Sequence, residues 1–552
     1  MAAPVTCGRV PRKPSGRFLA WVLVLISSTA LLSSCHGPGQ AAGPLTYYLS
    51  PSGSNAAAGT SPATAWRSLG RASAAVLPPG SRLLLQGGRR FSGRLTLGTR
   101  DAGDAARPVR IGSYGKGRAT IVSSSAVGIA IDDTAGVEIS NLTVTGTSAR
   151  PASGAGINVY SDLHRDQRLG SMLIRQVNVS GFANGIAVGA ANGATGFRDV
   201  SISDSVLHGN LDAGLQTYGT NFASGEPVYA NEDVNVSRVV AYGNPGDPAD
   251  HAASSGSGII LGSVRTGSIS WSAAYDNGGR GRAHQGPEGI WTYNSTGIVI
   301  QHNISYDNRT HGAVDGNGIG LDQNTSNSYM QYNLSYGNDG AGYLIYSPYH
   351  NGQEAHDVVR FNISSDNGRD GSPKFGGINV SGIVSDTAIY QNTVVARSSP
   401  SMPSPDLSLG DQLQGVIIRD NILMTQGGPI VFAKAALRRS SALLQGNDYY
   451  SSSAAWSVLW GADSYPSLSA WRSASGQETR ADKPTGFTID PDLTGPVLGL
   501  RATTAGQADA GFALRPGSPL IGAAILPNGP QPALRNYAGA LIPARSPDVG
   551  AE

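Results

Sequence analysis

Short runs in which apolar and polar residues alternate recur along the chain at a nearly constant interval. One asparagine context returns at separations of 30, 29, 30 and 29 residues, at Asn303, Asn333, Asn362, Asn392 and Asn421. Short β-branched runs such as 298–300 lie between these asparagines. Alternation with a period of two predicts strands, and the constant interval predicts that one coil of about thirty residues is repeated.

A second asparagine column accompanies the first, at Asn277, Asn308, Asn338 and Asn367. A coil that climbs one strand spacing per turn, about 4.8 Å, places equivalent residues directly above one another. Stacked asparagines at a bend can hydrogen-bond to one another and to the backbone, which satisfies polar groups that a buried turn would leave unpaired. The repeat therefore predicts an all-β solenoid whose inward Ile, Val and Leu residues form continuous apolar columns.

These columns resemble the asparagine ladders of the pectate-lyase-like superfamily, over about residues 120–450. The resemblance implies a right-handed parallel β-helix but no single activity, because this fold serves lyases, hydrolases, epimerases and phage tail spikes. The segments 47–54 with Trp66, and 514–520 with 547–552, are similar to opening and closing motifs of secreted bacterial β-helix proteins. We expect caps at both ends, since a bare terminal turn exposes apolar surface and unpaired strand edges.

The N-terminal segment has the pattern of an export signal. Basic residues between Arg9 and Arg17 precede an apolar run at 18–32, and the tetrapeptide ending at Cys35 resembles the bacterial lipobox. The resemblance implies cleavage before Cys35, lipidation of that cysteine, and attachment to the membrane at the extracellular face of the bacterial envelope. An uncleaved membrane anchor is the alternative, although the apolar run is short for a full span.

These patterns divide the chain into five predicted segments. The length of 552 residues does not by itself require several domains, because repeat folds grow long as one unit. We expect a lipoprotein signal peptide at 1–34, a tether at 35–45, an N-terminal cap with the first turns at 46–125, the parallel β-helix at 126–450, and a C-terminal capping region at 451–552.

Composition narrows the range of partners. Loss of residues 1–34 removes four basic residues and no acid, which changes the formal charge from +2 to −2. A near-neutral chain without a basic stripe is not expected to bind nucleic acid. The two cysteines are Cys7, lost with the signal, and Cys35, so we expect neither a disulfide nor thiol chemistry.

One group of strands carries candidate binding residues. Four strands align at glycines, namely Gly258, Gly289, Gly318 and Gly342. Alternation then places the aliphatic residues inside and four others outside: Trp291, Tyr293, Asp322 and Tyr346. We expect Asp322 to be exposed between Tyr293 and Tyr346. Aromatic faces pack on sugar rings, and carboxylates bind hydroxyl groups or carry protons, so this face predicts a carbohydrate cleft.

Ionisable residues that break the repeat lie close to these strands. The candidates for catalysis are Asp322, Glu288 and Asp315, and those for substrate binding are Trp291, Tyr293, Tyr346, His284, His311 and Gln323. Glu288 could instead cap a turn or pair with Arg280 or Arg282, and Asp315 could serve only to form a turn. By contrast, three acids recur in register and are predicted to be structural: Asp276, Asp307 and Asp366.

Three functions are compatible with these residues. A glycoside hydrolase acting on a polysaccharide would use two of the three candidate acids. A polysaccharide lyase or uronate epimerase would use a His or Arg base and possible calcium at Asp315 and Asp322; otherwise no cofactor is expected. A non-catalytic glycan-binding rod would need aromatic residues without converging acids. The aperiodic acids favour the hydrolase.

Overall fold

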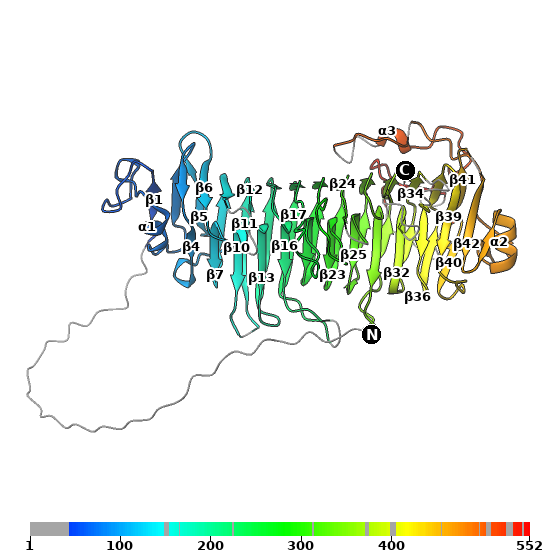
Figure 1. The fold of residues 1–552 in the computed structure, drawn as a ribbon, viewed down its shortest axis with the longest axis horizontal. Helices are drawn as coiled ribbons and strands as arrows, with labels where there is room; N and C mark the ends of the chain where they lie inside the picture. The colour runs from blue at the N-terminus through cyan, green and yellow to red at the C-terminus, as the bar shows by residue number, and fades with distance from the viewer. Residues whose placement is uncertain are drawn as a thin grey trace, which may run out of the picture. The chain divides into compact units, whose positions relative to one another are not determined.

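The chain winds as a solenoid in which three sheets run side by side along the stack (Figure 1). The computed structural model describes residues 43–147, 154–164, 166–222, 226–311, 314–369, 375–397, 404–453, 455–495, 497–503, 509–525, 534–543 and 546–551. Within the three sheets, strands of successive turns pair in parallel except at the last strand, β43 (Asp463–Tyr465), which is antiparallel to its neighbour. The right-handed parallel β-helix expected from the repeat is confirmed.

Each turn passes through sheet A, then sheet B, then sheet C. Sheet A contains β1 (Thr46–Leu49), β2 (Arg82–Gln86), β5 (Val109–Tyr114), β8 (Val137–Ser140), β11 (Arg168–Arg175), β14 (Gly196–Ser203), β17 (Asn231–Ser237), β20 (Val264–Ser270), β23 (Ser295–Gln301), β26 (Thr325–Ser326), β27 (Tyr329–Gln331), β30 (Val358–Arg360), β33 (Ala388–Tyr390), β37 (Val416–Arg419) and β40 (Ala442–Gln445). Sheet B contains β3 (Arg90–Ser92), β6 (Ala119–Ser123), β9 (Leu142–Gly146), β12 (Asn178–Ser180), β15 (Val206–His208), β18 (Val240–Tyr242), β21 (Ala273–Tyr275), β24 (Ile304–Tyr306), β28 (Leu334–Tyr336), β31 (Ile363–Ser365), β34 (Thr393–Ala396), β38 (Ile422–Thr425) and β41 (Asp448–Ser451).

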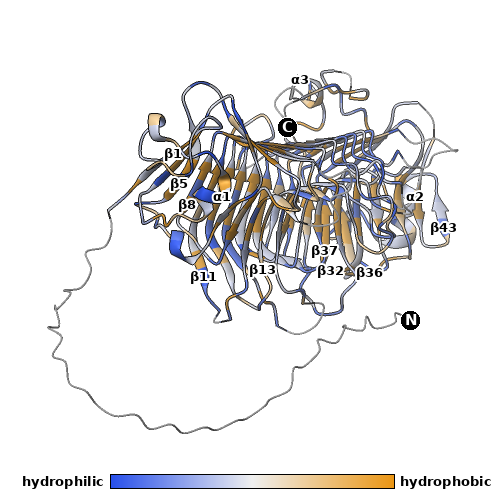
Figure 2. Ribbon diagram, turned by 60° about the vertical axis from the view of Figure 1, so that its left-hand side comes forward, coloured by the Kyte–Doolittle hydropathy of each residue, from blue (hydrophilic) through white to orange (hydrophobic). Residues whose placement is uncertain are grey.

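Sheet C carries the candidate site. Its strands are β4 (Leu95–Leu97), β7 (Ile129–Asp132), β10 (Ala155–Ser161), β13 (Asn184–Ala190), β16 (Ala213–Tyr218), β19 (Ser257–Gly262), β22 (Glu288–Tyr293), β25 (Asn317–Asp322), β29 (Tyr343–Ser347), β32 (Ile378–Ser385), β35 (Leu407–Leu409), β36 (Gln412–Gln414), β39 (Gly428–Ala433), β42 (Trp456–Trp460) and β43. Its aliphatic residues stack in register, as Ile259, Ile290 and Ile319 do, and all three are fully buried. Figure 2 shows apolar residues following the strands of the stack, which is the core that the alternating pattern predicts.

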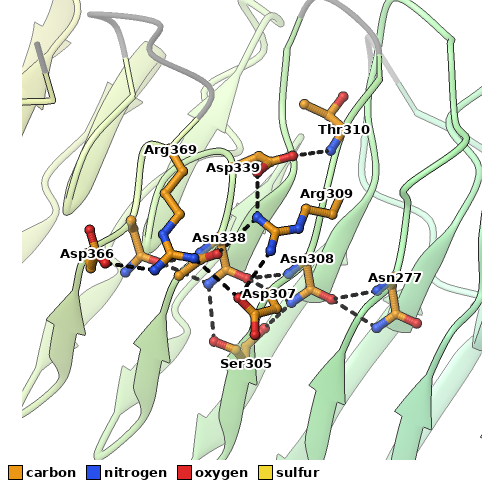
Figure 3. Close-up of polar contacts among 12 residues, drawn as sticks. Asn277, Ser305, Asp307, Asn308, Arg309, Thr310, Asn338, Asp339, Asp366 and Arg369 are labelled. Carbon is orange, nitrogen blue, oxygen red and sulfur yellow. Dashed lines mark hydrogen bonds and ion pairs between the residues drawn. The ribbon is translucent and has the colours of Figure 1, made fainter. Parts of the chain in front are cut away.

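Both asparagine columns form ladders of buried side chains. In the first, the Asn303 amide donates to Asn333 Oδ1 at 3.1 Å, and the Asn333 amide donates to Asn362 Oδ1 at 3.0 Å. In the second, Asn277 donates to Asn308 and Asn308 to Asn338, each at 2.9 Å (Figure 3). Each amide also donates to a backbone carbonyl of the preceding turn, so the ladders satisfy buried polar groups at the bends.

The recurring aspartates occupy turns beside the second ladder. Asp276, Asp307 and Asp366 all have a left-handed backbone, with φ of 53°, 52° and 55°. Asp307 forms ion pairs with Arg309 of its own turn and with Arg369 two turns later, and Asp366 pairs with Arg369 (Figure 3). These contacts are the structural role that their periodicity predicts.

The N-terminal end of the core is covered by a short segment before the second strand of sheet A. It contains β1, the 3₁₀ turn η1 (Pro62–Thr64) and the short helix α1 (Leu69–Ser73), with Trp66 buried beneath them. Tyr47 stacks on Trp66 with 4.3 Å between the ring centroids. These residues cover the N-terminal end of the apolar core.

The C-terminal region continues the solenoid by one strand before it covers the end of the core. The last parallel strand, β42, extends the solenoid to Trp460, and α2 (Leu468–Ser475) then covers the end with the buried Trp471. The antiparallel pair β44 (Thr479–Arg480) and β45 (Lys483–Pro484) follows. The remaining described chain, with α3 (Asp509–Phe512), returns along the outside of sheet B (Figure 1), where Tyr336 Oη donates to the Ala502 carbonyl at 2.7 Å. The apolar outer residues of sheet B, such as Leu334, explain why this segment packs sideways.

Three of the sequence predictions concern residues outside the described ranges. They are the signal peptide at 1–34, the lipidation of Cys35, and most of the tether at 35–45. Among the residues that the structure describes, no helix is long and apolar enough to cross a membrane.

Candidate functional site

The outward positions of sheet C form two adjacent columns. In the first, Trp291 is in register with Gly320 of the next turn. In the second, Asp322 is in register with Tyr346, and Tyr293 occupies the equivalent position one turn earlier. The structure therefore places these side chains on the strand face that alternation predicts.

Glu288 lies against a glycine of the next turn. Its carboxylate oxygen Oε2 is 2.1 Å from the point where a Cβ atom of Gly320 would be, so any side chain at residue 320 would displace it. Glu288 is only 3% exposed, and Oε2 has no hydrogen-bond partner among the described residues. Burial raises the pKa of Glu288 well above its ordinary value, and the charges of Asp322 and Asp315 raise it further.

Asp322 is buried, which corrects the expectation that it is exposed. The residue is 8% exposed, and its Oδ1 atom has no hydrogen-bond partner in the described part of the chain. Burial raises the pKa of Asp322 well above its ordinary value, the Asp315 charge adds to this, and hydrogen bonds from Gln323 oppose it. Gln323 thus contacts the candidate acid directly. Packing by neighbouring turns accounts for the burial, because an outward strand position need not be open to solvent.

Asp315 has a different environment from the other two acids. Its Oδ2 accepts a hydrogen bond from the Gly286 backbone at 2.7 Å, and its Oδ1 accepts one from the Asn317 side chain at 3.1 Å. Burial raises the pKa of Asp315 to about 6, while these two hydrogen bonds and the charge of His284 hold it down. Its φ of 66° also gives it the turn role that was the alternative. Asp315 can therefore form the turn and also take part in the chemistry of the site.

Asn317 links the loop acid to the strand acid. Its amide donates to Asp315, and a hydrogen bond between Asn317 and Glu288 lowers the pKa of Glu288. Asn317 is fully buried, and its Oδ1 accepts the backbone N–H of Ala341 at 2.7 Å, which fixes the direction of the amide. The electrostatic effects of Asp315 on both other acids show that the three carboxyls form one cluster.

The aromatic residues flank this cluster. Trp291 and Tyr293 are half-buried, with their ring centroids 5.2 Å apart and their planes at 33°. The indole N–H of Trp291 donates to Ser257 Oγ at 3.1 Å on the preceding turn. Tyr346 is half-buried, and its pKa is raised by burial and then by the charge of Asp322. Two aromatic walls therefore flank the acids, with ring surface left partly open.

The second column extends toward the N-terminus through two tyrosines that were not predicted. Tyr160 and Tyr218 are half-buried and lie on alternate turns, with Gly189 in register between them. A Cβ atom at Gly189 would be 2.6 Å from the Tyr218 ring, so the missing side chain lets this ring lie flat over the turn. Tyr293 covers Gly262 in the same way. Aligning the glycine-led strands that precede Gly258, at Gly156 and Gly214, would have found both tyrosines.

A loop between β16 and β17 runs along one side of the site sheet. The Phe222 carbonyl accepts a hydrogen bond from Asn324 at 3.0 Å and another from Asn351 at 3.3 Å, which lie on two successive turns. Arg168 holds the same loop by donating to the Tyr229 carbonyl at 2.6 Å. The described parts of this loop, 219–222 and 226–230, therefore cross several turns beside the columns.

A second pair of buried acids lies on the C-terminal side of the cluster. Glu354 accepts the Thr325 backbone N–H at 2.8 Å, and Asp357 accepts that of Ser328 at 2.8 Å. Burial raises the pKa of both well above their ordinary values, and the charge of Asp322 contributes to the shift of Glu354. Both acids break the repeat, so the rule that selected Glu288 could have selected them.

The remaining predicted residues lie outside the cluster of carboxyls. His284 and His311 are exposed, and His284 acts on Asp315 through its charge. Glu288 forms no ion pair with Arg280 or Arg282 in the described part of the chain. Among the described residues, no three His, Cys, Asp or Glu side chains are placed to hold one metal ion, so calcium at Asp315 and Asp322 has no such ligand set.

Comparison with known proteins gives similarity in structure but not in sequence. No family model and no curated protein matches the chain. Similar solved structures include the GH136 lacto-N-biosidase from Eubacterium ramulus, with 16% identity, 65% of this chain and 66% of that chain covered, and a TM-score of 0.48. Pectate lyase Pel9A has 14% identity, with 93% of this chain and 96% of that chain covered and a TM-score of 0.41. The A-module of the mannuronan C-5 epimerase AlgE6 from Azotobacter vinelandii has 14% identity, with 75% of this chain and 91% of that chain covered and a TM-score of 0.43. The chain spans just under two thirds of the first of these proteins.

Proposed function

We propose that the protein is a glycoside hydrolase that cleaves a polysaccharide bound along the outer face of sheet C. The observation that carries this proposal is the different hydrogen bonding of two neighbouring carboxyls, since both Asp315 oxygens accept hydrogen bonds and Asp322 Oδ1 accepts none among the described residues. Burial raises the pKa of Asp315 to about 6 while its hydrogen bonds favour the ionised form, whereas burial and the Asp315 charge raise the pKa of Asp322 well above its ordinary value. Two neighbouring carboxyls held in opposite protonation states are the requirement for acid-assisted glycosidic cleavage.

Each acid then has a defined role. In this scheme Asp322 donates its proton to the glycosidic oxygen after substrate binding exposes its buried Oδ1, which has no hydrogen-bond partner in the described structure. Asp315 acts as the carboxylate that either attacks the sugar or activates a water molecule. Burial and the charges of Asp322 and Asp315 raise the pKa of Glu288, which disfavours a further charge in the cluster. Its burial against Gly320 makes it a positioning residue in this scheme.

A column of aromatic rings along the outer face of sheet C fits a polymer rather than a small molecule. Tyr160, Tyr218 and Tyr293 present rings on alternate turns before the acids, and Tyr346 follows them. Such rings pack on the apolar faces of sugars. A lyase needs a base with cationic partners around a uronic carboxylate, and the cluster instead consists of carboxyls. This composition favours hydrolysis.

The proposal is tested by incubating the protein with neutral and acidic polysaccharides and measuring new reducing ends. We expect cleavage of at least one polymer, without the absorbance of an unsaturated uronate product. Accumulation of that absorbance would assign a lyase instead. Retention of a polysaccharide without any cleavage would assign a glycan-binding rod.

The pH dependence of catalysis follows from the two protonation states. Activity requires ionised Asp315, so kcat/KM should rise as the pH increases through about 6. It should fall at higher pH, where Asp322 loses its proton, since the pKa of Asp322 is raised well above its ordinary value. A pH–rate profile measures both limbs. A profile that stays flat around pH 6 would exclude Asp315 as the ionised partner.

Tyr218 should contribute to binding of long substrates. Tyr218→Ala removes the ring that covers Gly189, and we expect about a five- to tenfold higher KM on the polymer, with little change in kcat. Tyr218→Phe keeps the ring and should retain most of the affinity. Tyr242→Ala provides a matched control, because Tyr242 is a half-buried tyrosine in the separate ring stack of sheet B. Equal changes of KM in the two alanine variants would contradict substrate binding along the outer face of sheet C.

A further inference from the structure

Three arginines line a hollow on the outer face of sheet A, in the first turns of the solenoid. Its volume is about 360 Å³. The lining residues come from β2, β5 and β8, the bend after β8, and β11; they are Arg82, Leu84, Arg110, Ile111, Gly112, Ser113, Glu138, Ser140, Asn141 and Arg175. With three arginines and one glutamate, the lining carries two net positive charges.

Two of these arginines already have a partner. Arg110 donates to one oxygen of Glu138 at 3.0 Å, and Arg175 donates to the other at 2.8 Å. The Glu138 side chain is 9% exposed, so this pairing neutralises an acid that is otherwise almost buried. The same arrangement occurs further along sheet A, where Arg168 and Arg265 pair with the two oxygens of Glu232. Pairing of one glutamate with two arginines therefore has a structural role in sheet A.

Arg82 distinguishes the hollow from that second pairing. It is in register with Arg110, which in turn is in register with Glu138, but both Glu138 oxygens are already engaged. Arg82 is exposed and has no ion pair or side-chain hydrogen bond within the described part of the chain. Its guanidinium therefore brings an uncompensated charge to the hollow.

The lining also offers neutral donors and open space. Neither the Ser140 hydroxyl nor the Asn141 side-chain amide is engaged in a hydrogen bond within the described structure. Gly112 lies one turn before Ser140. A Cβ atom at Gly112 would be 3.1 Å from the Ser140 carbonyl oxygen. A side chain at Gly112 would therefore crowd Ser140 in the lining of the hollow.

We propose that this hollow binds an oxyanion group, a carboxylate or a sulfate or phosphate ester, carried by an acidic polysaccharide. Arginine presents several N–H donors in a fixed plane that matches such groups, and charge-assisted hydrogen bonds of this kind are strong. The hollow lies on sheet A, whereas the carboxyl cluster lies on sheet C. It is thus a second site that holds polymer without taking part in cleavage, and it does not depend on the proposed hydrolysis.

Binding of the full-length protein to acidic polymers tests this site. Affinity electrophoresis in gels containing polygalacturonate, dextran sulfate or neutral dextran measures retardation, and added inorganic phosphate measures competition by a free oxyanion. We expect retardation by at least one acidic polymer, weakened by phosphate and by salt. Retardation by one acidic polymer but not the other identifies the carboxylate or the sulfate as the group bound.

Arg82→Gln is the decisive variant, because Arg82 is exposed and makes no contact that folding requires. We expect its affinity for the acidic polymer to fall about tenfold. Arg198→Gln is the matched control: Arg198 is an exposed arginine of the same sheet, forms no ion pair among the described residues, and does not line the hollow. No retardation by either acidic polymer, or equal losses in the two variants, would overturn the proposal.

Discussion

Asp322→Asn should reduce hydrolysis by about a hundred- to ten-thousand-fold while the protein remains folded. The amide has nearly the shape of the protonated carboxyl, and burial raises the pKa of Asp322 well above its ordinary value, so a neutral side chain suits this site. An amide cannot donate a proton to the glycosidic oxygen, which removes the proposed acid. Reducing-end assays measure the loss, and circular dichroism verifies the fold.

Asp406→Asn is the matched control for this experiment. Asp406 is fully buried, has a raised pKa because of burial, and carries an Oδ2 atom without a hydrogen-bond partner among the described residues. It therefore resembles Asp322 in its burial, its raised pKa and its unpaired oxygen, but no neighbouring acid contributes to its pKa. We expect Asp406→Asn to leave kcat within about a factor of two. Comparable activity in the Asp322 and Asp406 variants would show that the cluster is not the catalytic centre.

Asn333→Ala should destabilise the solenoid by about 3–5 kcal/mol. Asn333 Oδ1 accepts the Asn303 backbone N–H at 3.0 Å and the Asn303 amide at 3.1 Å. The Asn333 amide itself donates to the Ile300 carbonyl at 2.9 Å and to Asn362 at 3.0 Å. The substitution leaves two donors and two acceptors without these partners in the interior. The thermal unfolding midpoint measures the effect.

The appropriate comparison is Asn235→Ala, at an exposed asparagine outside the ladders. Asn235 accepts one hydrogen bond, from Ser268 at 2.8 Å, in contact with solvent. Water replaces that bond, so we expect a change below about 0.5 kcal/mol. If both variants unfold at the same temperature, the ladder does not contribute the stability that we assign to it.

The asparagine spacing was sufficient to predict the fold because each turn repeats the same hydrogen-bonded bend. Asn303 and Asn333 occupy equivalent bends, and a side chain that satisfies one bend satisfies the next. Alternation likewise predicted that Asp322 and Tyr346 share a register, since strand side chains point to opposite faces in turn. Periodicity thus determined the position of the candidate site along the chain.

Burial of the site could not be predicted from the same pattern. Asp322 is enclosed by residues of neighbouring turns and loops, and loop conformation does not follow the repeat. The loop near Phe222 contacts Asn324, which is 102 residues away in sequence, so no local signal reports it. The return of the C-terminal chain to Tyr336 is a contact of the same kind. The prediction of an exposed Asp322 was wrong for this reason.

Hydrolysis by the carboxyl cluster is tested most directly by following the oxygen of water into the product. A polysaccharide that the protein cleaves is digested in heavy-oxygen water, and the new chain ends are weighed by mass spectrometry. We predict one heavy oxygen at each newly formed reducing end, because Asp315 either activates water or is itself displaced by it. An unsaturated product that is lighter by one water molecule and carries no label would contradict hydrolysis and assign elimination instead.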